Sequence, residues 1–363
     1  METSPIRSSQ RKSDILPSNF EPDKLKIIAG GVLQEEGNSM GCEKLNSSAK
    51  KWKLADFDIG RCLGKGSFGS VYLAREKVSR FIFSLKILYK SSFTSPDSMQ
   101  QLCREIDIQF HLRHPNIVQL FSYFYDHKRI YLMFEYVPKG HLEDELKKFQ
   151  YFTHIRAASY LYQLASAINY FHNKHIIHRD IKATNVLIGS KGEVKITDFG
   201  QSIHRPSSNR NKFVGTIEYI PPEIALCTED NVSNTPYDQS VDIWSLGILT
   251  FFMLTGELPF AKFDLATTMK HIQTGQIVIP ERIGSEASTI IRAMLQYDPK
   301  RRLNAEQLIA HRWVVNNSEK DLSRCQSALN DWEAIKLHHP TSKENTLSFS
   351  SCSISFNSSN SNN

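Results

Sequence analysis

The hydrophobic positions of the chain change their period once along its length. In the first part apolar and polar residues mostly alternate, as in strands with one buried face, and one segment of helical spacing interrupts them. The expected elements are strands over residues 57–77 (turning at its glycines), 80–89, 117–125 and 130–137, and a helix over 98–112. From Ile155 onward helical spacing dominates, and Thr153 is a suitable cap for the first long helix. We therefore expect an α+β fold of two lobes, a small β-rich N-lobe with one main helix and a larger α-helical C-lobe.

The limits of this organised region follow from composition and from strand-breaking residues. It covers residues 51–315, with the N-lobe at 51–137 and the C-lobe at 141–315. Pro138 and Gly140 end the last strand of the N-lobe, so we expect a hinge at residues 135–140. A tail at 1–50 precedes this region, and a C-terminal extension at 316–363 follows it. The tail 1–50 and the extension from about residue 341, which is rich in serine and asparagine, are expected to be disordered because they cannot bury enough apolar surface to fold.

Composition narrows the class of protein. The 363 residues are 40% hydrophobic, which suffices for a sizeable core, and the longest apolar run, residues 243–254, is too short to span a bilayer. The N-terminus lacks the apolar segment of a secretory signal, and the six cysteines lack metal-ligand spacing, which favours free thiols in a reducing compartment. The net charge of +6 suits anionic ligands, but no nucleic-acid motif is present, so neither nucleic acid nor a membrane is expected as a direct partner.

Two neighbouring motifs carry the candidate chemistry: HRDIKATN at residues 178–185 and DFG at residues 198–200. Their residue types and spacing are similar to the catalytic loop and the magnesium loop of protein kinases. In that reaction a carboxylate orients the acceptor hydroxyl, and metal ions neutralise charge between the phosphates. Asp180 is the expected base, and Asn185 and Asp198 are the expected oxygen ligands of Mg²⁺. An isolated Asp180 would more readily be a turn or cap residue, whereas the two motifs together seldom arise by chance.

A glycine-rich turn before these motifs fits a nucleotide-binding loop. The sequence GKGSFGSV at residues 64–71 follows one expected strand and leads into another. Glycines let backbone amides approach phosphate oxygens without a Cβ clash. A dinucleotide-binding turn requires a helix after the glycines, so that alternative is disfavoured. The residues expected around ATP at this turn are Leu63, Gly64, Gly66, Gly69 and Val71.

Lys86 lies within an apolar strand, where an amino group is costly unless it is paired. Its expected partners are the ATP phosphates and Glu105 on the following helix; the alternative is a lysine that reaches solvent from an edge strand. Phe134 is expected at the back of an adenine pocket, and the backbones of Glu135 and Val137 are expected to bond adenine.

With these residues in place, the chain resembles the Aurora kinases, a mitotic serine/threonine family. The resemblance covers residues 52–314 and rests on Gln109 and on long blocks, among them DFDIGRCLGKGSFGSVYLAREK, REIDIQFHLRHPNIVQLFSYF, HIIHRDIK, DFGQSIHRPSS and GTIEYIPPE. It implies ATP and Mg²⁺ as cofactors, protein substrates and an activating mitotic partner on the N-lobe. It also implies a location in the nucleus and cytoplasm, at the mitotic spindle, the centrosome or the chromosomes.

The resemblance further assigns roles to single residues. Lys182, two residues after the base, is expected to contact the transferred phosphate, with Thr216 close to it on a serine/threonine substrate shelf. Three more residues have implied structural roles. Glu223 is expected to form an ion pair with Arg302, and Asp242 is expected to bond the backbone of the catalytic loop.

The chain departs from the family in its activation loop. The usual phosphothreonine position falls on Lys212, which cannot accept a phosphate and whose charge opposes that of Arg179, the usual phosphate receiver. We therefore expect activity that does not depend on the usual activating phosphorylation. Gln201 replaces the tryptophan that usually follows the DFG motif. Ser84 replaces the alanine usually found under the adenine ring, a small change that is expected to be tolerated. Residues 227–236 are expected to be an insertion that forms a polar surface loop.

Substrate choice is expected to differ as well. The positions that usually hold glutamates for an arginine upstream of the target residue hold Thr184, Phe252 and His141. Because a bidentate arginine contact needs a carboxylate, we predict a weaker preference for upstream arginine. The acidic run at residues 143–145 is an alternative, partial source of carboxylates, but a solvated helix start is the expected interpretation.

Two alternatives stay open at the level of sequence, a pseudokinase-type scaffold and a non-mitotic serine/threonine kinase. The presence of Lys86, Glu105, Asp180, Asn185 and Asp198 together favours an active enzyme. The tripeptide KEN at residues 343–345 matches a mitotic degradation signal, but three residues in a polar tail arise readily by chance.

Overall fold

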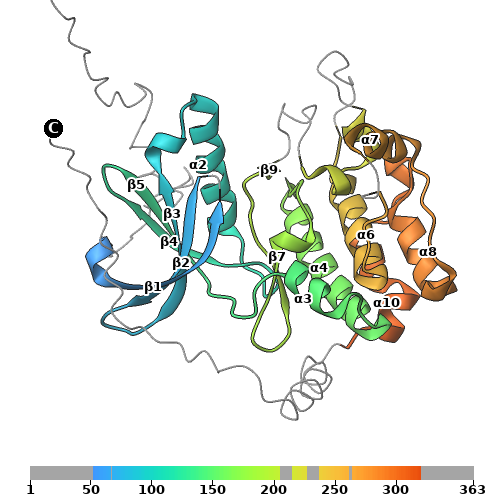
Figure 1. Cartoon of the computed structure of the whole chain (residues 1–363), viewed down its shortest axis with the longest axis horizontal. Helices are drawn as coiled ribbons and strands as arrows, with labels where there is room; N and C mark the ends of the chain where they lie inside the picture. Colours follow the sequence, from blue (N-terminus) through green and yellow to red (C-terminus); the bar gives the residue numbers. More distant parts are fainter. Residues whose placement is uncertain (1–51, 67, 205–214, 227–236, 261–263, 320–363) are drawn as a thin grey trace, which may run out of the picture.

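The computed structural model describes residues 52–66, 68–204, 215–226, 237–260 and 264–319 of the chain. They form an antiparallel sheet with one long helix beside a larger helical body, and residues 135–140 connect the two (Figure 1). The predicted α+β fold of two lobes is confirmed. The expected tail at 1–50, the C-terminal extension from residue 320 onward, the insertion at 227–236, Lys212 and the tripeptide at 343–345 lie outside the described residues. Residues 316–319 of the expected extension are described, and the last helix continues to Asn317.

The N-lobe sheet has its five strands in the order β1-β2-β3-β5-β4. The bounds are β1 Phe57–Gly66, β2 Gly69–Glu76, β3 Ile82–Tyr89, β4 Leu120–Tyr125 and β5 Arg129–Phe134. Alternation along the strands gives the sheet two apolar faces. Phe83 and Leu85 pack with Phe57 on one face, whereas the other face is covered by α2, Pro96–His111.

Helix α2 positions a carboxylate above the sheet. Its first turn is preformed, because Ser95 accepts a hydrogen bond from the Ser98 amide at 3.2 Å and Pro96 needs no N–H there. Leu102 and Ile106 lie four residues apart and are buried against the sheet, which stabilises the helix by about 1.5–3 kcal/mol for each side chain. Glu105 lies between these two residues and therefore faces β3.

The C-lobe is built around two long helices, α4 His154–Asn173 and α6 Ser240–Thr255. As predicted, Thr153 caps α4 by accepting a hydrogen bond from the Arg156 amide at 3.3 Å. Helix α6 is apolar on nearly every side and almost wholly buried, which confirms the apolar run as a buried helix. The other helices are α3 Leu142–Phe149, α5 Pro222–Ala225, α7 Leu265–Thr274, α8 Ser285–Met294, α9 Ala305–Ala310 and α10 Arg312–Asn317. Within the described ranges, no helix has the length and apolar character needed to cross a membrane.

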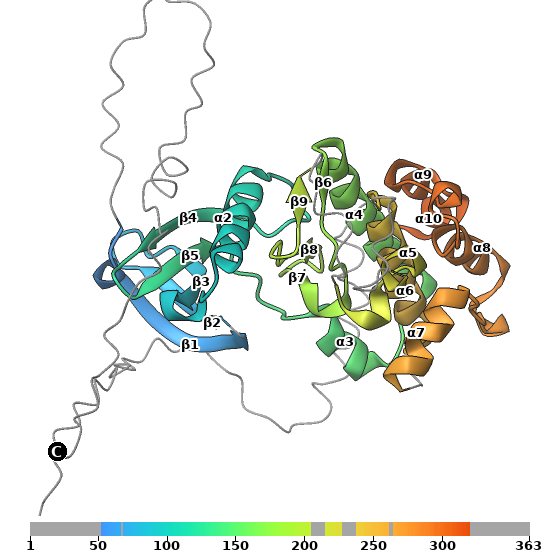
Figure 2. The same ribbon diagram turned by 90° about the horizontal axis from the view of Figure 1, so that it is seen from above.

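Short strand pairs hold the functional loops beside the junction of the lobes (Figure 2). Strand β6 Ile176–Ile177 pairs with β9 Ile203–His204, and β7 Val186–Ile188 pairs with β8 Val194–Ile196. The catalytic loop, residues 178–185, connects β6 to β7 and ends in the 3-10 turn η3 Ala183–Asn185. The magnesium loop, residues 198–200, lies between β8 and β9. Both motifs are therefore tied into one small structural unit.

Three predicted strand limits were wrong at their ends. Strand β5 ends at Phe134 rather than at residue 137, because residues 135–137 leave the sheet to cross to the C-lobe. Strand β4 begins at Leu120, since Ile117 pairs instead with Ile196 of the C-lobe in an isolated bridge. Strand β3 begins at Ile82, because Arg80 has a left-handed backbone (φ 62°) in the preceding turn.

Candidate active site

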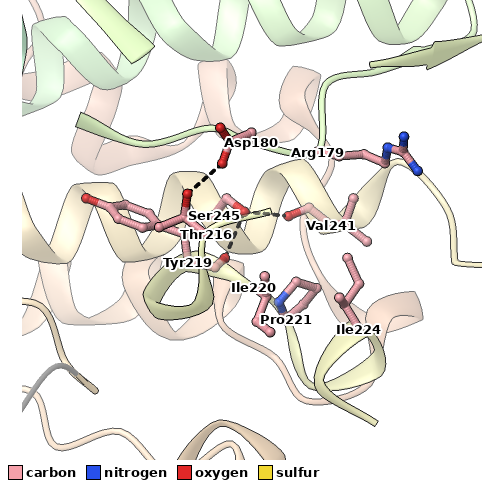
Figure 3. A pocket seen from close by; sticks show the side chains of 9 residues that line it. All are labelled: Arg179, Asp180, Thr216, Tyr219, Ile220, Pro221, Ile224, Val241 and Ser245. Atoms are coloured by element: carbon pink, nitrogen blue, oxygen red, sulfur yellow. Dashed lines mark hydrogen bonds between the residues drawn. The ribbon is translucent and has the colours of Figure 1, made fainter. Parts of the chain in front are cut away.

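Three polar side chains, two of them from the catalytic loop, surround the Asp180 carboxylate. Its Oδ1 accepts a hydrogen bond from Thr216 Oγ1 at 2.8 Å, and its Oδ2 lies 2.8 Å from both Asn185 Nδ2 and Lys182 Nζ. Lys182 Nζ also donates to Thr216 Oγ1 at 2.6 Å. Figure 3 shows Thr216 directed at Asp180 across the mouth of a small pocket. The four residues predicted to act together are therefore in direct contact.

A buried carboxylate from α6 fixes the shape of this loop. Asp242 accepts hydrogen bonds from the His178 amide at 3.0 Å, the Arg179 amide at 2.8 Å and His172 Nε2 at 2.8 Å. Arg179 has a left-handed backbone (φ 69°), which is unfavourable for a residue with a Cβ and needs such support. Burial opposes ionisation of Asp242, but the hydrogen bond and charge of His172 outweigh it, and the pKa lies below its usual value. The predicted role of Asp242 is confirmed.

His178 is held as a neutral imidazole with one defined tautomer. The Asp180 amide donates to its Nδ1 at 3.3 Å, so the other nitrogen, Nε2, carries the proton and donates to the Thr197 carbonyl at 3.3 Å. Burial lowers the pKa of His178, although Asp242 and other nearby carboxylates oppose the effect. The Nδ1 bond thus holds the catalytic loop together internally, and the Nε2 bond joins the loop to the chain before the magnesium loop.

Lys86 and Glu105 form an ion pair across the N-lobe, 2.9 Å apart. Burial by itself would lower the pKa of Lys86, but the carboxylates of Glu105 and Asp198 outweigh burial and raise it. The lysine is therefore kept charged at physiological pH and points from β3 toward α2 and the magnesium loop. A lysine reaching solvent from an edge strand is excluded, because β3 lies between β2 and β5.

The magnesium loop presents an open carboxylate above a buried ring. Phe199 is fully buried, and its ring lies 4.7 Å from His178 and 6.0 Å from Phe171, measured between centroids. Asp198 is exposed and has a left-handed backbone (φ 63°). Gln101 of α2 donates to the Gly200 carbonyl at 2.6 Å, a contact between the lobes that sequence patterns did not indicate.

The donors in this region fit a divalent metal held partly by phosphate. No cluster of three or more His, Cys, Asp or Glu side chains occurs in the described ranges. Mg²⁺ in phosphoryl-transfer sites needs only one or two protein oxygens, since water and substrate phosphates complete its shell. Asp198 offers carboxylate oxygens to solvent, and Asn185 directs its Nδ2 at Asp180, which leaves its amide oxygen for another ligand.

The glycines of the nucleotide loop have different physical reasons. A Cβ at Gly64 would meet no atom within 4 Å, so the space beside this backbone is open, as a phosphate-binding turn requires. A Cβ at Gly69 would lie 1.9 Å from the Ile87 carbonyl oxygen, so this glycine permits β2 to pack closely on β3. Val71 on β2 pairs with Lys86 on β3, and Leu63 on β1 is half-buried nearby in the sheet.

The hinge is fixed by bonds to both lobes. The Glu135 side chain forms an ion pair with Lys195 at 2.9 Å, and its backbone amide donates to the Gln119 carbonyl at 2.9 Å. Ser84 Oγ donates to the Glu135 carbonyl at 2.8 Å. Phe134 and Val137 are buried on either side of this residue. Lys195 comes from β8, which the sequence did not relate to the hinge.

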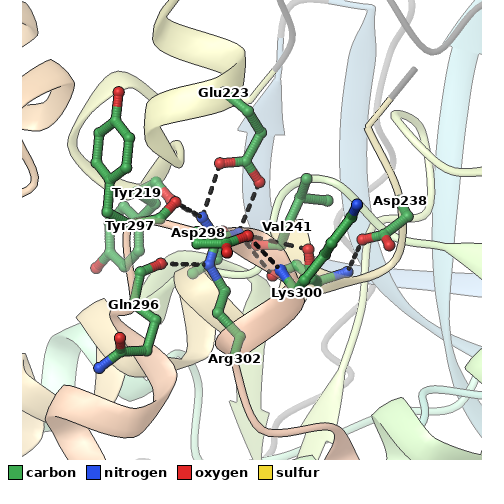
Figure 4. A network of polar contacts seen from close by, with 11 residues as sticks. Tyr219, Glu223, Asp238, Val241, Gln296, Tyr297, Asp298, Lys300 and Arg302 are labelled. Atoms are coloured by element: carbon green, nitrogen blue, oxygen red, sulfur yellow. Dashed lines mark hydrogen bonds and ion pairs between the residues drawn. The ribbon is translucent and has the colours of Figure 1, made fainter. Parts of the chain in front are cut away.

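An ion pair inside the C-lobe holds the chain after the substrate shelf. Arg302 bonds both oxygens of Glu223, at 2.6 and 2.7 Å, as predicted (Figure 4). The guanidinium also lies over the ring of Trp244, 5.0 Å from its centroid. A bidentate pair with a stacked guanidinium is among the stronger buried arrangements. It secures α5 against α6 and against the turn that follows α8.

The chain matches the protein kinase domain family over residues 57–314. It is 47% identical over 269 residues to an Aurora kinase of Dictyostelium discoideum, covering 74% of this chain and 68% of that protein. The chain belongs to the Aurora kinases. Serine/threonine-protein kinase Aurora-1 of Arabidopsis thaliana is 45% identical over 275 residues (75% of this chain, 91% of the relative), and Aurora kinase B of Mus musculus is 42% identical over 296 residues (81% and 84%). As a member of this family, the protein is an ATP-dependent serine/threonine protein kinase.

The predicted solvation of the acidic run at residues 143–145 was wrong for one residue of this Aurora kinase. Glu145 is not solvated, because it is buried in an ion pair with Arg156. The Arg156 guanidinium lies over the ring of Phe152 at 4.1 Å from its centroid, which shields the pair. Asp144 is exposed, as expected of a helix start. Glu145 is therefore committed to the fold and is not offered to a substrate arginine.

The three positions expected to lack substrate carboxylates lie in two places. His141 and Thr184 are neighbours, because His141 Nδ1 lies 2.6 Å from the Thr184 carbonyl oxygen. Phe252 lies on α6 and packs partly against the C-lobe core. Lys212 lies outside the described residues, whereas Arg179 is described. The Nε of Arg179 donates to the Gln201 carbonyl at 2.6 Å, and its Nη1 donates to the Tyr237 hydroxyl at 2.7 Å.

Proposed function

We propose that this Aurora kinase transfers the γ-phosphate of ATP to serine or threonine hydroxyls of proteins with Asp180 as the base. The cluster of Asp180, Lys182, Asn185 and Thr216 carries the proposal, because every donor around the base is already within 2.6–2.8 Å of its acceptor. Such a preformed arrangement is what phosphoryl transfer demands, since its catalysis is mainly positioning and charge stabilisation.

In this mechanism Asp180 accepts the proton of the substrate hydroxyl while Lys182 stabilises the charge of the phosphoryl group in transfer. Thr216 bridges the two residues and keeps their separation fixed. Asn185 and Asp198 are the residues that would hold Mg²⁺, which when bound neutralises charge between the phosphates. Lys86, oriented by Glu105, is proposed to bind the ATP phosphates from the N-lobe side.

The nucleotide is proposed to lie between β1, β2 and the hinge. Its phosphates would meet the backbone of Gly64 and Gly66, and the space beside Gly64 is open. Leu63 and Val71 would cover the adenine ring from the N-lobe, and the Glu135 and Val137 backbones would bond its polar edge. Phe134 and Val137 are buried beside this edge.

A comparison of the wild-type chain with Asp180→Asn tests the assignment. The two proteins are expected to bind ATP equally, while incorporation of radiolabelled phosphate into a generic basic protein falls at least a hundredfold in the variant. Asp144→Asn, an exposed carboxylate in α3, is the matched control and is expected to retain the wild-type rate. Equal and negligible rates for all three proteins would instead support a pseudokinase scaffold.

We also propose that the switch for activity differs from that of relatives with a phosphorylated threonine. The support is Arg179, whose guanidinium already has neutral oxygen partners on Gln201 and Tyr237. Lys212, in the segment where a phosphate would be expected, carries a positive charge of its own. Protein treated with phosphatase is expected to keep its activity. Loss of activity that returns only with a phosphate on residues 207–216 would contradict this.

Substrate choice and cellular location form the last part of the proposal. We propose a weak preference for upstream arginine, because His141, Thr184 and Phe252 carry no carboxylate and Glu145 is committed to Arg156. Strong selection of arginine two residues upstream in a peptide library would refute it. The mitotic role of the family makes the spindle, the centrosome or the chromosomes the proposed location, with an activating partner on the N-lobe. Activity of the isolated chain with and without candidate mitotic activators tests the partner.

A further inference from the structure

Ser84 lies where the central strand of the N-lobe meets the hinge. It is buried on β3 and pairs in register with Phe134, the last residue of β5. Its hydroxyl donates to the Glu135 carbonyl oxygen at 2.8 Å and lies 3.5 Å from the Phe134 carbonyl oxygen. Both partners are backbone carbonyls, which only accept hydrogen bonds, so the serine must be the donor.

A hydroxyl has one proton and two lone pairs. Because the single proton of Ser84 is directed at the Glu135 carbonyl, the lone pairs are what the side chain offers to a ligand at the hinge. The Glu135 carbonyl likewise offers only lone pairs. The polar edge of the pocket therefore presents two adjacent acceptors, one from the backbone and one from a side chain.

The hinge acceptor is held in place, which makes the pattern selective. Glu135 is tied to the C-lobe by its ion pair with Lys195 at 2.9 Å and to the N-lobe by the bond of its amide to Gln119 at 2.9 Å. The Gln119 amide in turn donates to the Glu135 side chain at 3.3 Å. Ser84 is held by pairing of β3 with both β2 and β5. Neither acceptor is free to turn away from an unsuitable ligand.

We propose that Ser84 is a specificity-determining residue that selects purine nucleotides with a 6-amino group over those with a 6-oxo group; the inference rests on the proposed binding of ATP at the hinge. The amino group of adenine has two N–H donors, one for the Glu135 carbonyl and one for Ser84 Oγ. A 6-oxo purine places a carbonyl oxygen against two acceptors, and neither of them donates a hydrogen bond to it while the Ser84 proton stays on the Glu135 carbonyl. Sites that bond a polar group reject analogues that cannot return the bond.

Inosine triphosphate is the probe that isolates this effect, because it differs from ATP only at position 6 and in the proton on the neighbouring ring nitrogen. Binding of both nucleotides, with Mg²⁺, is measured by calorimetry on the full chain, and KM and kcat are measured for both. In Ser84→Ala, KM for ATP is expected to rise about 3- to 10-fold, as for loss of one neutral hydrogen bond, while KM for inosine triphosphate stays or falls. The ratio of kcat/KM for ATP to that for inosine triphosphate therefore falls about 3- to 10-fold.

Two further variants separate recognition from a merely structural tie between β3 and the hinge. Ser84→Thr keeps the hydroxyl and is expected to restore the ratio, whereas Ser84→Cys, with a weak donor, is expected to resemble Ser84→Ala. An unchanged ratio in Ser84→Ala, or an equal loss for both nucleotides, would overturn the inference. If the wild-type chain binds neither nucleotide, the proposed nucleotide site itself fails, and the inference fails with it.

Discussion

The bond between Arg179 and Tyr237 makes a quantitative prediction about activation. Tyr237→Phe removes only the hydroxyl that accepts from Arg179 Nη1 at 2.7 Å, and both side chains are buried. Hydrogen bonds to a charged group contribute about 1.5–3 kcal/mol. If the whole contribution stabilises the active arrangement of the catalytic loop, kcat/KM falls by about 10- to 150-fold.

The smaller value is the expected one. Arg179 keeps its bond from Nε to the Gln201 carbonyl at 2.6 Å, and its backbone amide stays bonded to Asp242 at 2.8 Å. The loop is therefore loosened on one side only, and a decrease of about tenfold follows from a loss near 1.4 kcal/mol. Most of the decrease should appear in kcat, because the bond lies behind the base and away from the nucleotide.

The assay compares phosphatase-treated wild type and Tyr237→Phe at saturating ATP, with thermal unfolding as a check on the fold. Tyr151→Phe is the matched control, since Tyr151 is 53% exposed and its ring contact with Arg282 survives the change. It should leave kcat/KM within twofold of wild type. Equal kcat/KM for treated wild type and Tyr237→Phe would refute the reasoning, as would a wild type that is inactive until phosphorylated.

Three further predictions concern buried ionisable side chains. Lys86→Met leaves Glu105 buried without its ion pair. We expect kcat/KM to fall at least a hundredfold and the free energy of unfolding, measured by chemical denaturation, to fall by about 3 kcal/mol or more. Wild-type activity in this variant would show that Lys86 does not belong to the active site. Asp242→Asn places an NH₂ group against the backbone donors of the catalytic loop. The free energy of unfolding, measured in urea, should therefore fall by about 3 kcal/mol. A decrease below about 1 kcal/mol would show that other residues hold the loop. Burial lowers the pKa of His178, so the folded state binds fewer protons than the unfolded state below pH ~6.5, and stability declines as the pH falls through that window, by at most ~1.4 kcal/mol per pH unit. His178→Phe should flatten this pH dependence in thermal melts between about pH 6.5 and 5, and an unchanged slope would contradict it.

The close placement of the proposed catalytic residues could be predicted from sequence because these residues have fixed spacings along the chain. Asp180 and Asn185 lie on one loop, and the motif that contains them also defines the loop's shape. The bond of Ser84 to Glu135 joins residues 51 positions apart, and the bond of Arg179 to Tyr237 joins residues 58 positions apart. Such contacts depend on how the strands and lobes are placed, and no local pattern encodes them.

The same distinction explains why the charge pattern predicted a solvated Glu145, although this side chain is buried. A run of acidic residues at a helix start usually faces water, where it favours the positive end of the helix dipole. Whether one member turns inward depends on a cation from another helix, here Arg156 of α4, and on the aromatic rings that cover that cation. Local charge patterns describe the probable surface of a helix, but burial is decided by the partner helix.

The arrangement of buried and exposed groups indicates why chemistry and recognition can vary separately in this kinase. Asp180 is held by Asn185 and Thr216, while the backbone of its loop is bonded to Asp242 inside α6. Thr184, one residue before Asn185, contributes its backbone carbonyl to His141 rather than its side chain. A change of the Thr184 side chain therefore alters the substrate surface without breaking any bond that orients the base. This physical separation would allow the proposed change in substrate recognition to occur without loss of the groups proposed for phosphoryl transfer.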